Sequence, residues 1–193
     1  MQEIIEYLKK IRRRYASFRS APRDNKAVSE LDTVRDWLNS MSKDGGCCHY
    51  RNPKTNPEDP PDCVVVDENG NPVGIEVTEF VCEEAVARSV KMEGGVNYRE
   101  WEDLEIVREL EKILLKKDGK SYKRATYKKL ILLIHTDEPL LRFDRAKKLL
   151  NGQTFDKPTQ INEAYLLFSY DPSSRQSNTP KYPFIKLKFT DDQ

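Results

Sequence analysis

The sequence predicts an α/β fold in which helices flank a mixed central β-sheet. An apolar hairpin at 62–80 lies between two segments with helical periodicity, and a continuous apolar run follows at 130–134. Apolar runs of this kind are typical of strands that are buried on both faces. The length of 193 residues suits a single domain, since domains commonly have about 100 to 200 residues.

Apolar residues at three- and four-residue intervals predict five helices. Their expected ranges are Met1–Arg19, Lys26–Lys43, Cys82–Glu93, Tyr98–Lys117 and Leu140–Leu150. In the fourth helix the residues expected to face the core are Trp101, Leu104, Val107, Leu110 and Leu114. The first helix is basic and amphipathic. We therefore predict that residues 1–24 form a helical extension, and that residues 25–193 form one domain with its core at about 26–136.

Six segments have the composition of strands. They are Cys47–Arg51, Asp62–Asp67, Pro72–Phe80, Lys128–His135, Ala164–Tyr170 and Phe184–Phe189. Residues 52–61 contain four prolines. Because proline can neither continue a helix nor donate to a central ladder, this stretch is predicted to be neither helix nor paired strand. It forms a rigid loop that ends at Asp62.

The charge pattern limits the function without defining it. The formal net charge is only +1 although 34% of the residues are charged, so the chain as a whole is not expected to attract polyanions. Basic residues gather at 12–26 and again at 112–129, whereas 76–111 is acidic. No apolar stretch approaches the roughly 20 residues of a membrane span, and the start lacks the pattern of a signal peptide. We expect a soluble, cytoplasmic protein without a membrane partner.

The hairpin carries two acidic residues whose relative position depends on its turn. Asp62 begins the first strand and Glu76 lies in the middle of the second. A two-residue turn would place Asp62 opposite Val77 and point the two carboxylates to opposite faces. A three-residue turn at 68–70, with Gly70 left-handed, would place Asp62 directly opposite Glu76. Glycine in the third position favours this second turn.

In the second register the carboxylates would lie about 5.5 Å apart at Cβ, where like charges repel. A cation between them would relieve this repulsion, and hard oxygen ligands suit Mg²⁺ or Mn²⁺. The other interpretation is that one of the two residues is a strand end in solvent or is paired with Arg88. The pattern alone leaves both interpretations open.

These residues resemble the motif of a nuclease superfamily. Pro61-Asp62, 13 intervening residues and Glu76-Val77-Thr78 are similar to the motif of the PD-(D/E)XK superfamily, which has the restriction-endonuclease-like fold. The resemblance covers residues 26–136 and implies an αβββαβ core in a sandwich of helices around the sheet. It implies that Asp62 and Glu76 bind Mg²⁺ or Mn²⁺, with the Val77 carbonyl as a further ligand. It also implies an additional acid at Glu30.

The sequence departs from this motif at Thr78, where the resemblance implies a lysine that helps to activate water and offsets transition-state charge. The cation could instead come from the following helix, and there we favour Lys91 or Arg88. Metal ions could do most of the chemistry, or the site could be inactive. His135 ends a buried strand, where open α/β sheets often place site residues, but a structural role is more frequent for such a histidine.

The predicted function is a metal-dependent phosphodiesterase that acts on nucleic acid, with DNA preferred over RNA as the expected substrate. The alternative is an inactive nuclease-like domain that binds nucleic acid or protein. A third hypothesis is an interaction protein whose carboxylates are surface residues. A homodimer is compatible with all three.

Overall fold

The computed structural model describes residues 23–43, 49–58, 60–82, 100–122, 126–138, 140–168 and 182–190. The elements are α3 (Arg23–Lys43), β1 (Tyr50–Thr55), β2 (Cys63–Asp67), β3 (Pro72–Glu79), α5 (Asp103–Asp118), β4 (Lys129–Thr136), α6 (Phe143–Leu150), β5 (Glu163–Phe168) and β6 (Phe184–Lys186). The predicted N-terminal helix and nearly all of the predicted helix at 82–93 lie outside these residues. Among the described helices, none has the length and apolar character needed to cross a membrane.

The six strands form one mixed sheet in the order in which they occur along the chain. β1, β2 and β3 are antiparallel neighbours. β4 pairs in parallel with both β3 and β5, and the long connections carry α5 and α6. β6 closes the sheet as an antiparallel edge strand. The predicted α/β class with a mixed sheet is confirmed.

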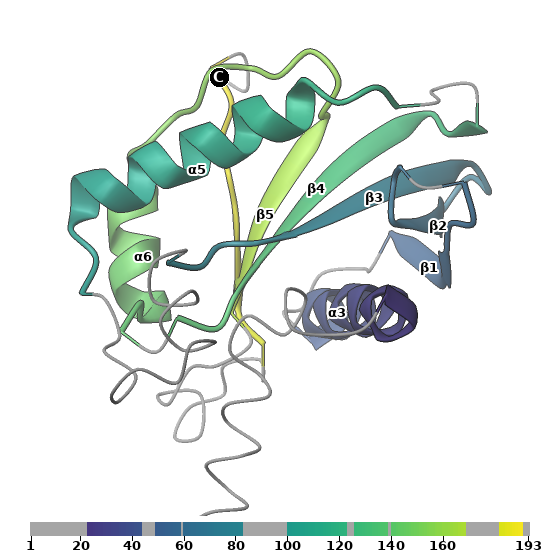
Figure 1. Ribbon diagram of the computed structural model, residues 1–193, viewed down its shortest axis with the longest axis horizontal. Helices are drawn as coiled ribbons and strands as arrows, with labels where there is room; N and C mark the ends of the chain where they lie inside the picture. Colours follow the sequence, from purple (N-terminus) through teal and green to yellow (C-terminus); the bar gives the residue numbers. More distant parts are fainter. Residues whose placement is uncertain are drawn as a thin grey trace, which may run out of the picture.

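Helices cover both faces of the sheet (Figure 1). Residues of α3 pack with β2, β3 and β4 on one face, around the fully buried Trp37. Residues of α5 and α6 pack on the opposite face with β4 and β5. Side chains of β4 pack on both faces of the sheet. Ile131 and Leu133 point toward α3, and Leu132 and Ile134 point toward α5. Its continuous apolar sequence therefore has the physical cause predicted for it, burial on both faces.

One loop prediction is wrong. Residues 52–55, assigned to the rigid loop, belong to strand β1, which pairs with β2. The pairing shifts between Arg51 and Lys54, and Asn52 adopts a positive φ of 56°. β1 is an edge strand, where a bulge can accommodate Pro53 because the outer side of the strand needs no ladder donor. The rest of the proline-rich segment leads to Asp62 as predicted.

The start of α5 also differs from the prediction. The helix begins at Asp103, where Glu102 and Glu105 form a capping box. Leu104 was expected to face the core, yet it is 68% exposed. The buried stripe consists of Ile106, Leu110 and Leu114. This stripe determines which side chains of α5 point toward the sheet.

Candidate functional site

The turn between β2 and β3 has the geometry that brings the two acidic residues together. The Asp67 amide donates to the Asn71 carbonyl at 2.9 Å, and Gly70 has a φ of 80°. Cys63 pairs with Ile75, so the preceding residue Asp62 falls opposite Glu76. The three-residue turn is therefore confirmed, together with the register predicted from it.

Both acidic residues lie on the face of the sheet that α5 covers. Ile75 and Val77 belong to the core cluster around α3, and side chains alternate along a strand, so Glu76 points toward α5. Glu76 is fully buried. Asp62 accepts a hydrogen bond at Oδ2 from the Val77 amide, at 2.7 Å. This bond holds the Asp62 carboxylate beside the backbone of β3, next to Glu76.

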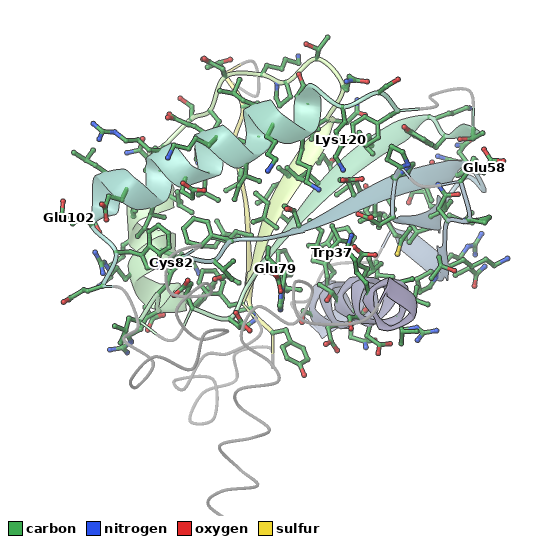
Figure 2. All side chains as sticks on the ribbon, viewed as in Figure 1. Trp37, Glu58, Glu79, Cys82, Glu102 and Lys120 are labelled. Carbon is green, nitrogen blue, oxygen red and sulfur yellow. The ribbon has the colours of Figure 1, made fainter. Side chains whose placement is uncertain are left out.

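Two lysines bind Glu76, one in the last turn of α5 and the other just past its end. Lys117 Nζ lies 2.6 Å from Glu76 Oε1, and Lys120 Nζ lies 2.7 Å from the same oxygen. Lys117 Nζ also approaches the Val77 carbonyl at 3.4 Å. The Lys117 side chain is only 12% exposed, whereas that of Lys120 is 42% exposed. In Figure 2, Lys120 lies at the C-terminal end of α5, above β3.

The backbone that carries these lysines is held by neighbouring groups. The Tyr122 hydroxyl donates to the Lys117 carbonyl at 3.0 Å. The Gln160 side-chain amide donates to the carbonyls of Asp118 and Lys120. In return, the Asp118 carboxylate accepts from the amides of Thr159 and Gln160 at 2.8 and 2.6 Å. These contacts fix the segment that places both ammonium groups on Glu76.

Burial and neighbouring charges shift the pKa values of Asp62, Lys117 and Lys120. Burial, with the negative charges of Glu76 and Glu30, raises the pKa of Asp62 to about 7. Burial lowers the pKa of Lys117, and attraction to Glu76 opposes this shift. For Lys120 burial also acts to lower the pKa, but the hydrogen bond and attraction to Glu76 outweigh it and raise the value. Lys120, the more exposed of the two, therefore has the higher pKa and holds its proton more firmly than Lys117.

The other predicted site residues are placed as follows. Glu30 is buried on α3, forms an ion pair with Lys26 at 3.1 Å, and lies close enough to raise the pKa of Asp62. Arg88 and Lys91 lie outside the described residues. His135 is buried at the end of β4, and this burial lowers its pKa to about 4. The imidazole is therefore neutral near pH 7.

The sequence analysis missed Lys117 and Lys120, although a signal for Lys117 exists. Lys117 follows Leu114 by three residues and Leu110 by seven, so it continues the buried stripe of α5. A lysine on an apolar stripe needs an acidic partner or a path to solvent. Lys120 follows Gly119, the C-cap of the helix, and its position could not be inferred from helical spacing.

The oxygen donors at this site fit the Mg²⁺ or Mn²⁺ that the motif implies. Glu76 Oε2 is buried and accepts no hydrogen bond in the described part of the chain. The Asp62 carboxylate accepts from the Val77 amide, and Lys117 Nζ contacts both Glu76 Oε1 and the Val77 carbonyl, so the three donors belong to one small region of β3 and its neighbour. Residues 23–190, where described, hold no group of three or more His, Cys, Asp or Glu side chains arranged to bind a metal. Mg²⁺ needs only one or two protein carboxylates, since it usually retains several waters.

Gly74 allows the close approach that positions Asp62. A Cβ atom at residue 74 would lie 2.8 Å from Pro61 Cγ and 3.2 Å from Tyr127 Cγ. We expect Gly74→Ala to displace Pro61, and with it Asp62, and to destabilise the protein by about 1–3 kcal/mol through overpacking. Urea unfolding would measure this loss. Gly152→Ala is the matched control, because a Cβ there meets no atom within 4 Å. Equal stability of both variants would contradict the expectation.

Comparison with known proteins gives no match to a protein family, a curated protein or a solved structure.

Proposed function

We propose that the protein is a metal-dependent phosphodiesterase that cleaves nucleic acid, a variant of the PD-(D/E)XK nucleases with the restriction-endonuclease-like fold. The observation that carries this proposal is the contact of Lys117 with Glu76, beside Asp62. Lys117, on a different element of the fold, supplies the cation that Thr78 cannot provide.

Each residue has a chemical role in this proposal. Asp62, Glu76 and the Val77 carbonyl would hold Mg²⁺ or Mn²⁺. The bound ion would make a water more acidic and polarise the phosphate. Lys117 orients Glu76 and offsets the negative charge that develops on the phosphate. Glu30 adds negative charge near Asp62, which favours binding of a cation.

A cleavage assay with Asp62→Asn tests the proposal. We expect the wild-type protein to cleave labelled DNA or RNA with Mg²⁺ or Mn²⁺ and to lose activity in EDTA. Asp62→Asn should reduce the rate at least tenfold, because the variant loses one charged ligand while its amide oxygen can still accept from Val77. Asp144→Asn is the control, since Asp144 lies on α6, away from the site. Full activity of Asp62→Asn would contradict the proposal.

The alternative is an inactive domain that binds nucleic acid or protein, and one observation favours it. Two ammonium groups already neutralise Glu76 without a metal ion. An inactive domain that binds nucleic acid would bind it in EDTA, without requiring a metal ion, and would not cleave it under any metal condition.

A further inference from the structure

A groove of about 800 Å³ lies between the C-terminal end of β3 and one face of α5. Thr78, Glu79, Val81 and Cys82 line its sheet side. Residues of α5 from its first turn to its last line the other side, so the groove follows the helix. Figure 2 shows Cys82 near the start of α5 and Lys120 at its end.

Basic side chains are regularly spaced along the helical wall. Arg108, Lys112 and Lys116 are all exposed and all line the groove. Residues four apart on a helix lie on the same side, about 6 Å apart along its axis. Lys120 repeats the interval once more, beyond the helix end. The helical wall therefore presents three exposed cations in a row, and Lys120 adds a fourth basic side chain to the groove past the helix end.

Three of these cations, Arg108, Lys112 and Lys116, can bind a ligand at little energetic cost. Arg108 and Lys116 form no ion pair with any residue that the structure describes. Lys112 pairs with Glu109 at 3.2 Å, with its own side chain 73% exposed. Exposed pairs of this kind contribute about 0–1 kcal/mol. A ligand with negative charges can therefore replace Glu109 as the partner of Lys112.

Two lysines connect the basic end of the groove with Glu76. Lys117 and Lys120 line the groove and also contact Glu76. The acidic residues of this wall, Glu105 and Glu109, lie in the first half of α5, away from Glu76. Positive charge on the helical wall is therefore concentrated next to the site, although the whole chain carries only +1. The sheet side of the groove adds one acidic residue, the largely buried Glu79.

We propose that this groove binds the phosphodiester backbone of one nucleic-acid strand along α5 and directs one phosphate to Asp62 and Glu76. A row of exposed cations along one groove suits a polyanion with repeated negative charges, and the phosphodiester backbone carries one charge per nucleotide. The inference rests on the proposed function for its last step, because only a phosphodiesterase would need a phosphate at the carboxylates. Binding along Arg108, Lys112 and Lys116 does not depend on cleavage.

Binding can be measured by fluorescence anisotropy in EDTA, with 15-nucleotide single-stranded DNA, the matching duplex and single-stranded RNA as probes. We expect Lys112→Gln/Lys116→Gln to weaken binding about 10- to 100-fold at 0.1 M salt and to reduce the slope of log K against log salt by about 2. The control pair is Lys147→Gln/Lys148→Gln, which removes two exposed lysines from α6. This control should bind like wild type. The probe that binds most tightly shows whether the strand is single or part of a duplex.

Three outcomes would overturn the groove proposal: unchanged binding in the α5 variant, an equal loss in both variants, or equally good competition by polyglutamate of the same charge. The assay separates this proposal from the proposed function. If wild type cleaves nothing but only the α5 variant loses binding, the groove proposal stands and the phosphodiesterase fails. If Asp62→Asn abolishes cleavage while the α5 variant binds and cleaves like wild type, the proposed function stands and the groove proposal fails.

Discussion

Lys117→Met should reduce kcat for nucleic-acid cleavage by about 10²–10³-fold, the usual effect of removing one preorganised group that stabilises transition-state charge. Methionine keeps most of the length and the apolar stem of lysine, so the variant can still fill the space beneath α5. It removes the ammonium group that lies 2.6 Å from Glu76. Single-turnover cleavage at saturating Mg²⁺ would measure the change, and circular dichroism would verify that the variant folds.

Further variants separate this role from general loss of charge. Lys148→Met removes an exposed lysine from α6, outside the site and the groove, and should lower kcat less than threefold. Lys117→Arg keeps the charge but changes the shape of the donor, so it should restore part of the activity. Lys120→Met should have an intermediate effect, because Lys120 binds the same oxygen but is more exposed. If Lys117→Met cleaved as fast as Lys148→Met, the assignment of Lys117 would be wrong.

The hairpin shows how much of this site could be predicted from the sequence. A left-handed glycine in the third position of the turn determines the register, and the register brings Asp62 opposite Glu76. This information is local, because the turn and its two strands form one continuous segment. The burial of β4 on both faces could be predicted for a similar reason, since the five consecutive apolar residues within this strand leave it no polar side to expose.

The origin of the cation could not be predicted in the same way. Lys117 is 41 residues from Glu76 in sequence, and the contact depends on how α5 packs across β3. The predicted stripe of α5 included Leu104, which is exposed, but also Leu110 and Leu114, which are buried and lead to Lys117. Helical spacing therefore indicates which side of α5 Lys117 occupies, but not that Glu76 is its partner. The capping box at Glu102 and Glu105 determines where the helix begins. This start accounts for the burial of Ile106 in place of Leu104, whereas the position of Lys117 follows from Leu110 and Leu114 in either case.

Asp62→Asn should stabilise the metal-free protein at neutral and alkaline pH. In the folded protein the pKa of Asp62 is raised to about 7, mainly by burial and then by Glu76 and Glu30. The unfolded chain releases this proton at the ordinary value, near pH 4. Between these two values the folded state binds the additional proton, so the contribution of Asp62 to stability decreases as pH rises from about 4 to about 7 and stays low above that.

Asparagine carries no charge at any pH and keeps an oxygen that can accept from the Val77 amide. The variant and the wild-type protein should therefore be equally stable near pH 4, and the variant should be more stable by roughly 4 kcal/mol above pH 8. Urea unfolding in EDTA across this pH range would measure the difference. Addition of Mg²⁺ should stabilise the wild-type protein more than the variant, because the variant lacks one of the two carboxylates that would hold the ion. A difference in stability that stays constant with pH would show that burial and the neighbouring charges do not raise the pKa of Asp62. An equal response of both proteins to Mg²⁺ would argue against a metal at this carboxylate.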